Sequence, residues 1–383
     1  MDQTLKDLTK VVLVAYPDSF RLEEAKSLVE SLPQYKIVKV FTQRYLDHAQ
    51  YGMGSGKAEE IKNFVKESSA AAADKVQQII VDEHLTTKQI YNLEKLTELQ
   101  VIDRERLILN IFSSRATTTE SKLQIELAEI KYQLPRVRQT SKINSGSERP
   151  GKGGMGEYVV DVKLRELKRQ MSFIQQKLEH AHKKRELYHR QRMETELPVV
   201  SLVGYTSSGK TTLFNLLTQS NKETSDDLFT TLSTTTRSLK IHSNNNNTKI
   251  LLVDTVGFIS RLPHYMVDAF KSTLEESLGA DLILLLIDSS EAIEDIRIKY
   301  SSCWKVLGEL GVNKSKVLVI LTKYDDDNMH FEKIKEIANN LELFNPMVIS
   351  SKGGYGIHKL KTLIGDILLS HNRHWATITK TRT

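Results

Sequence analysis

The chain has 383 residues, 27% of them charged, with a formal net charge of +6 and one cysteine. Its apolar runs, such as residues 282–287 and 317–321, are too short to span a bilayer, and residues 1–10 lack the apolar block of a signal peptide. These features exclude a membrane-spanning chain and an internal disulfide, and we expect a cytoplasmic protein of two or three domains.

The first third of the chain alternates short apolar runs with helical patterns. The apolar runs are residues 10–16, 35–41 and 76–81, and helical spacing appears over 23–32, 57–65 and 87–96. Such alternation predicts parallel strands covered by helices. We therefore expect a small α/β domain over residues 1–115.

One stretch of this domain imitates a phosphate-binding loop. Residues 52–57, GMGSGK, are one residue short between the glycines and lack Ser or Thr after Lys57. They also follow no buried strand, which the motif requires. We expect a turn at the start of a helix.

A long helical hairpin is predicted over residues 116–194. The helical pattern of residues 117–134 ends at Pro135, which has no N–H for a helix interior. Residues 139–156 are rich in Gly, Ser and Lys and predict a basic loop. Residues 157–194 form one long amphipathic pattern without proline, whose natural partner is the preceding helix.

Positive charge is concentrated around this hairpin. Residues 131–192 hold sixteen Lys and Arg against six Asp and Glu, so this segment carries +10 and the rest of the chain carries −4. A local excess of this kind indicates a polyanionic partner. A solvated helix face has the same composition, and on charge alone the two interpretations are equally good.

A second α/β domain is predicted over residues 195–370, before a tail at 371–383. Its apolar, strand-like runs are residues 197–204, 250–253, 282–287, 317–321 and 347–349, with helical segments between most of them. Residues 238–242 and 248–253 flank four asparagines and predict a hairpin. The pattern indicates a mostly parallel sheet with helices on both faces.

Residues 204–211, GYTSSGKT, satisfy G-x-x-x-x-G-K-[ST] between an apolar strand and a helix. The backbone N–H groups of such a loop and the start of its helix cradle phosphates. We expect Lys210 to lie between the β- and γ-phosphates and the Thr211 hydroxyl to bind Mg²⁺. The predicted phosphate contacts are Gly204, Tyr205, Thr206, Ser207, Ser208, Gly209, Lys210, Thr211 and Thr212.

The stretch DTVGF follows a buried strand and resembles a switch that senses the terminal phosphate. Asp254 is expected to hold Mg²⁺ through water, and Gly257 to contact the γ-phosphate. Phe258 stands where a Ras-like GTPase has a water-orienting glutamine, and a phenyl ring cannot orient water. We expect slow intrinsic hydrolysis that a partner accelerates, with Phe258 either in a surface that rearranges with the γ-phosphate or in simple packing.

Residues 221–237 are polar and rich in threonine, as in a loop that becomes ordered around γ-phosphate and Mg²⁺. Thr235 is the predicted second hydroxyl ligand of Mg²⁺, with Thr234 and Thr236 as alternatives. Together with Lys210 and Gly257, Thr235 completes the predicted catalytic set.

The stretch LTKYD at residues 321–325 predicts guanine recognition. A carboxylate at Asp325 can accept both N1–H and N2–H of guanine, and adenine lacks this pair of donors. Thr322 replaces the usual asparagine, which predicts a weaker contact with the phosphate loop. The predicted base-side contacts are Thr322, Lys323, Asp325, Ser350, Ser351 and Lys352. A small-molecule kinase, the competing enzyme class, has no use for the T-K-x-D loop.

With these motifs in order, the chain resembles the HflX family of translational GTPases. GYTSSGKT is similar to that family's GYTNAGKST, and DTVGFISRLPHYMVDAFKSTLEE is similar to its DTVGFIRxLPHxLVxAFxxTLEE. GSGKAEEI and the run from NLEKLTELQ to KYQLPR extend the resemblance outside the GTPase domain. The resemblance implies a GTPase with Mg²⁺ and GTP or GDP as ligands, which binds the large ribosomal subunit and helps dissociate or rescue stalled or idle ribosomes.

The resemblance also implies that the N-terminal domain and the hairpin contact ribosomal RNA. The candidate RNA contacts are Arg136, Arg138, Lys142, Arg149, Lys152, Lys183, Lys184 and Arg185. We expect a monomer without membrane association. The alternative is a ribosome-assembly or RNA-binding switch protein in which GTP acts mainly as a conformational ligand.

Overall fold

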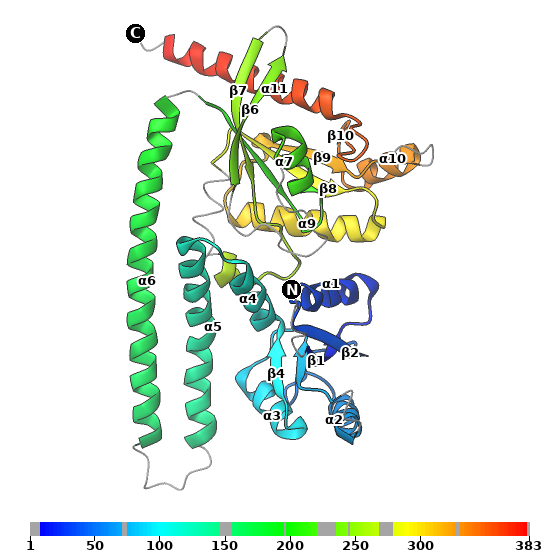
Figure 1. Ribbon diagram of the computed structural model, residues 1–383, viewed down its shortest axis with the longest axis vertical. Helices are drawn as coiled ribbons and strands as arrows, with labels where there is room; N and C mark the ends of the chain where they lie inside the picture. The colour runs from blue at the N-terminus through cyan, green and yellow to red at the C-terminus, as the bar shows by residue number, and fades with distance from the viewer. Residues whose placement is uncertain are drawn as a thin grey trace, which may run out of the picture. The chain divides into compact units, whose positions relative to one another are not determined.

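The computed structural model describes residues 8–70, 75–145, 155–194, 197–220, 235–243, 246–267, 279–325 and 330–380. The chain divides into two compact units, residues 1–179 and 180–383. Figure 1 labels most of their helices and strands. Within the described residues, no helix combines the length and the apolar character needed to cross a membrane.

The N-terminal unit is built on a parallel four-stranded sheet in the order β2-β1-β3-β4. Its strands are β1 (Thr9–Ala15), β2 (Tyr35–Thr42), β3 (Gln78–Val81) and β4 (Gln100–Asp103). The helices that alternate with them are α1 (Ser19–Glu30), α2 (Ser55–Ala70), α3 (Thr87–Thr97) and α4 (Arg104–Arg115). Residues 11–15 of β1 are fully buried, because helices cover both faces of a central parallel strand. The predicted α/β arrangement is confirmed.

The glycine-rich stretch at 52–57 leads into α2, which begins at Ser55. Gly52 has a φ of 75°, and a Cβ at this position would lie 2.3 Å from Cδ2 of Leu85. A turn with this backbone conformation favours glycine. The stretch is therefore a helix-entry turn, as predicted.

A buried ion cluster joins α1, β3 and α4. The Arg104 side chain is 3% exposed, and its Nη2 lies 2.7 Å from Oε2 of Glu24 while Nη1 contacts Asp82. The two carboxylates are 4% and 2% exposed. Removing the cation from such a cluster would leave buried charge without compensation, so Arg104 fixes the packing of all three elements.

The predicted helical hairpin consists of α5 (Thr119–Ser145) and α6 (Met155–Glu194), which lie side by side in Figure 1. Leu127 and Ile130 of α5 pack against Leu167 and Ile174 of α6. The spacing of these apolar residues matches one stripe along each helix.

The predicted end of the first hairpin helix at Pro135 is wrong, because α5 continues to Ser145. A proline removes only its own donor and strains one turn. Arg136, the next residue, donates from Nη2 to Asp103 Oδ2 at 2.7 Å and to the Leu85 carbonyl oxygen at 2.9 Å. These tertiary contacts hold the helix together beyond the proline.

The C-terminal unit contains a six-stranded sheet in the order β10-β9-β8-β5-β7-β6. All neighbours are parallel except β6 and β7, which form an antiparallel hairpin. The strands are β5 (Val199–Gly204), β6 (Thr235–Ser243), β7 (Asn246–Asp254), β8 (Leu282–Asp288), β9 (Val317–Thr322) and β10 (Met347–Val348). The helices are α7 (Lys210–Thr218), α9 (Ile293–Glu309), η2 (Lys314–Lys316), α10 (His330–Asn340) and α11 (Ile357–Lys380). This is the predicted, mostly parallel sheet of a P-loop domain.

Candidate active site

The phosphate loop runs from the end of β5 to the start of α7. Gly204 ends β5 with a φ of 154°, and a Cβ there would lie 2.4 Å from the carbonyl oxygen of Leu286. Gly209 precedes α7 with a φ of 89°. Both positions require glycine. Because the first N–H groups of a helix have no intrahelical acceptor, the start of α7 offers donors to an anion.

Lys210, the first residue of α7, is held by the carbonyl oxygens of its own loop. Its Nζ donates to Tyr205 O at 2.7 Å and to Gly204 O at 3.2 Å. The residue is 6% exposed. Burial lowers the pKa of Lys210 to about 8, against the opposing effect of the Asp254 carboxylate. Phosphate oxygens would supply the negative charge that stabilises this buried ammonium group.

The three predicted metal ligands come together. Thr211 Oγ1 donates to Oδ2 of the buried Asp254 at 3.2 Å, and Thr235 is the register partner of Asp254 across the β6–β7 pair. Thr236 follows on the opposite face of the strand, since side chains alternate along it, which favours Thr235. Thr234 lies outside the described residues. Hydroxyl and carboxylate oxygens are the donors that Mg²⁺ prefers, so these residues fit that ion.

The Asp-x-x-Gly segment is hydrogen-bonded to the phosphate loop. Thr206 N donates to Phe258 O at 2.8 Å, and Phe258 N donates to Gly204 O at 3.0 Å. A Cβ on Gly257 would lie 2.8 Å from Cγ2 of Thr206 and 3.1 Å from Nζ of Lys210. Gly257 therefore lies directly against the groups that are expected to hold the phosphates.

Phe258 is a buried packing residue in this structure, with 2% of its surface exposed. This environment agrees with the packing interpretation of Phe258 for the arrangement seen here. A phenyl ring offers no group that could orient an attacking water molecule. Most of the predicted first switch loop, residues 221–234, lies outside the described residues.

Thr322, which replaces the usual asparagine, contacts the phosphate loop directly. Its Oγ1 lies 2.9 Å from Ser208 O and 3.1 Å from Ile287 O, and the hydroxyl can donate to either carbonyl oxygen. A threonine at this position therefore ties the base-side loop to the phosphate loop.

The predicted guanine-binding residues converge after β9 and β10. The Ser350 hydroxyl donates to Asp325 Oδ1 at 3.0 Å, and Tyr324 N donates to Ile349 O at 3.2 Å. Lys323 adopts a φ of 58°, and its Nζ lies 2.6 Å from Asp288 Oδ2. The Asp325 carboxylate is thus oriented by the loop that contains Ser350, Ser351 and Lys352.

The remaining predicted phosphate contacts lie along the same loop. Ser207 is exposed with a φ of 60°, while Thr206 and Ser208 are buried and Thr212 is half-buried within α7. The whole set therefore surrounds the start of one helix.

Sequence reasoning did not select the turn between β8 and α9. Asp288 pairs with Lys323, and the Ser289 hydroxyl donates to Thr322 O at 2.6 Å. This turn therefore supports the base-side loop. A signal existed, because polar residues at the carboxyl end of a buried parallel strand commonly lie at a ligand site.

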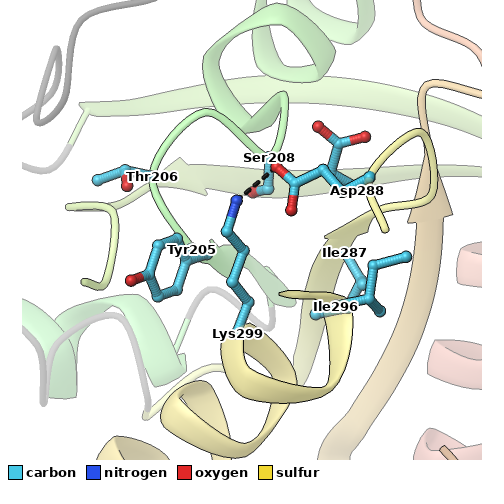
Figure 2. A pocket seen from close by; sticks show the side chains of 8 residues that line it. Tyr205, Thr206, Ser208, Ile287, Asp288, Ile296 and Lys299 are labelled. Atoms are coloured by element: carbon cyan, nitrogen blue, oxygen red, sulfur yellow. Dashed lines mark hydrogen bonds and ion pairs between the residues drawn. The ribbon is translucent and has the colours of Figure 1, made fainter. Parts of the chain in front are cut away.

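A small cavity lies between this turn and the phosphate loop (Figure 2). Tyr205, Thr206 and Ser208 line it from the loop, and Ile296 and Lys299 line it from α9. Its other lining residues are Ile287, Asp288 and Glu291. Lys299, which Figure 2 shows rising from α9 toward the loop, is a further residue that sequence reasoning missed.

Arg136, a predicted RNA contact, is tied to other residues of the N-terminal unit. Its guanidinium forms an ion pair with the fully buried Asp103 and stacks on Tyr132, with Cζ 4.0 Å from the ring centroid. Arg138 and Lys183 are exposed on the hairpin helices. The side chains of the other candidates lie outside the described residues: Lys142, Arg149, Lys152, Lys184 and Arg185.

Comparisons with known proteins cover both units. Three family models match in succession: "GTP-binding GTPase N-terminal" over residues 19–113, "GTP-binding GTPase Middle Region" over 115–192 and "50S ribosome-binding GTPase" over 199–323. GTPase HflX of Methanocaldococcus jannaschii is 38% identical over 91% of this chain and 83% of its own length. GTPase HflX of Escherichia coli is 36% identical over 88% of this chain and 77% of its own length.

A solved structure agrees with these relatives. The crystal structure of SsGBP in complex with GDP is 27% identical, covers 95% of this chain and 99% of its own, and has a TM-score of 0.52. The matches extend through the N-terminal unit and the hairpin as well as the P-loop domain. The chain therefore belongs to the HflX family of GTPases and is an enzyme that binds and hydrolyses GTP.

Proposed function

We propose that this GTPase binds the large ribosomal subunit in a nucleotide-dependent way and dissociates or rescues stalled or idle ribosomes. The observation that carries the proposal is the pair of hydrogen bonds between Phe258 and the phosphate loop. Through these hydrogen bonds, the segment that follows Gly257, the expected γ-phosphate contact, can respond to the nucleotide in the phosphate loop. The match to a ribosome-binding GTPase family supports the choice of partner.

The proposed chemistry divides among a few positions. Mg²⁺, bound by Thr211, Thr235 and, through water, Asp254, would neutralise charge that develops on the phosphates. Lys210 holds the β- and γ-phosphates as an ammonium ion, and Gly257 places its N–H against the γ-phosphate. Each of these contacts positions groups or stabilises charge, which is what phosphoryl transfer requires.

Intrinsic hydrolysis is slow in this proposal, because the buried Phe258 cannot orient water. The large subunit then accelerates the reaction by ordering the switch segments. Single-turnover hydrolysis of GTP with and without purified large subunits measures this effect. Equal rates would remove partner activation from the proposal.

The proposed RNA-binding surface lies on the hairpin, residues 116–194. Exposed basic residues occur along α6: Lys163, Arg165, Lys168, Arg169 and Lys177. Binding of ribosomal RNA by such groups releases counterions, so affinity should fall steeply with salt. We further propose that the protein acts as a monomer in the cytoplasm, with residues 1–115, 116–194 and 195–370 as its domains and 371–383 as a tail.

The surface is tested by replacing Arg138, Lys168 and Lys177 together with glutamine. Removal of each phosphate contact lowers the salt slope by about 1, so cosedimentation with large subunits should weaken and its slope should flatten. GTP affinity should stay the same. The matched control replaces three exposed lysines of the C-terminal unit, Lys305, Lys316 and Lys359. An equal decrease in both variants would contradict a specific surface.

Sedimentation of intact ribosomes tests the function itself. With GTP or a non-hydrolysable analogue, the protein should shift intact ribosomes into subunits, and with GDP it should not. Binding in the presence of GTP without any shift would instead favour an assembly or RNA-binding switch. The absence of a water-orienting side chain at Phe258 favours that second function, since GTP could then act mainly as a conformational ligand.

A further inference from the structure

Helix α9 presents one face to the phosphate loop. Ile296, Lys299 and Cys303 follow one another at intervals of three and four residues, which places them on the same side of the helix. Ile296 and Lys299 line the cavity beneath the loop, and Cys303 is fully buried. Tyr205 of the loop lines the same cavity. This face therefore supports the loop at Tyr205.

Lys299 is held in place from two directions. Its Nζ forms an ion pair with Oε1 of Glu291 and lies 5.1 Å from the centroid of the Tyr205 ring. The Lys299 and Glu291 side chains are 17% and 25% exposed. A partly desolvated cation over an aromatic face is attracted to it, so Lys299 fixes the orientation of the ring.

Tyr205 in turn contacts the segment that follows Gly257. Its hydroxyl oxygen accepts a hydrogen bond from Ser260 N at 2.6 Å, and the residue is 4% exposed. Ser260 lies three residues beyond Gly257. Its fixed position, together with the Phe258 hydrogen bonds, keeps Gly257 against Lys210.

We infer that Lys299, paired with Glu291, is a positioning residue for γ-phosphate recognition, which acts through Tyr205 and Ser260 to hold Gly257 beside Lys210. The inference rests on the proposed nucleotide switch. GTP contacts both Lys210 and Gly257, whereas GDP has no phosphate that reaches Gly257. Removal of the support should therefore weaken GTP binding more than GDP binding.

The test compares Lys299→Met with the wild-type protein. Methionine keeps most of the side chain's length and removes its charge. The affinities for GDP and for a non-hydrolysable GTP analogue are measured by fluorescence titration with Mg²⁺. We expect the ratio of analogue affinity to GDP affinity to fall roughly two- to tenfold, the range of one net hydrogen bond. GDP affinity and melting temperature should stay close to the wild-type values.

Three further variants sharpen the test. Tyr205→Phe removes the acceptor for Ser260 but keeps the ring, and it should lower the same ratio. Lys299→Arg keeps a cation over the ring and should restore the ratio. Lys305→Met removes an exposed lysine from the same helix and should change nothing.

Several outcomes would overturn the inference. If Lys299→Met lowers both affinities by the same factor, the pair only maintains the shape of the loop. If the ratio does not change in Lys299→Met or Tyr205→Phe, the contacts do not position Gly257. If the wild-type protein binds the GTP analogue and GDP with equal affinity, both the proposed switch and this inference are wrong. If the wild-type protein prefers the analogue and all variants keep that preference, only this inference is wrong.

Discussion

Guanine-nucleotide binding should take up a proton near pH 8, because Lys210 changes its protonation when the phosphates arrive. Burial lowers the pKa of Lys210 from 10.5 to about 8 in the nucleotide-free site. Negative phosphate oxygens favour the ammonium form and raise the pKa again. A base whose pKa rises on binding gains protons as the complex forms.

The size of the effect follows from the pKa of about 8. At pH 8 about half of the free protein carries a protonated Lys210, and nearly all of the complex does, so about 0.5 proton is taken up per GDP. At pH 7 the free protein is already about 90% protonated at this site, and the uptake falls to about 0.1. Because binding consumes a proton, affinity should fall as the pH rises through 8.

Isothermal titration calorimetry measures this uptake directly. GDP is titrated with Mg²⁺ present in Tris and in HEPES, two buffers with different ionisation enthalpies, at equal ionic strength. The difference in apparent binding enthalpy, divided by the difference in buffer enthalpy, gives the number of protons. Equal enthalpies at pH 8 would refute the reasoning. Uptake as large at pH 7 as at pH 8 would assign the proton to another group.

Three further predictions concern individual contacts. Arg104→Met should lower the free energy of unfolding of the N-terminal unit, measured by urea denaturation, by about 3–5 kcal/mol. Arg106→Met, which removes a half-exposed ion pair, should lower it by at most about 1 kcal/mol. Similar losses in the two variants would contradict a buried cluster at Arg104. Thr322→Val removes the donor to Ser208 and should weaken GTP and GDP binding alike by about fivefold in fluorescence titrations; a change in one nucleotide only would argue against a shared support. Pro135→Ala, at an exposed position inside α5, should raise the unfolding free energy by about 1–3 kcal/mol, and a decrease in stability would show that the proline is needed.

The local patterns predicted the strands, the order of the motifs and the hairpin. Those features follow from periodicity and from spacing within short segments, as in the phosphate loop between β5 and α7. The asparagine-rich hairpin also formed between β6 and β7, whose residues pair in register from Thr235 to Ser243.

The errors arose where distant residues meet. The helix was expected to end at Pro135, and the ion pair of Arg136 with Asp103 was not foreseen, because nothing nearby in the sequence points to Asp103 as the partner. The supports of the site were missed for the same reason. Lys299 lies 94 positions from Tyr205 in the chain, and only the packing of α9 under the loop brings them together.

Asp103 forms hydrogen bonds with residues from several elements of the N-terminal unit. Its carboxylate accepts hydrogen bonds from Arg106 N and the Tyr132 hydroxyl at Oδ1, and from Leu85 N and Arg136 at Oδ2. One side chain thus anchors α5 of the hairpin to the sheet and caps α4. A substitution there would release the hairpin from the sheet and leave every residue of the predicted nucleotide site unchanged.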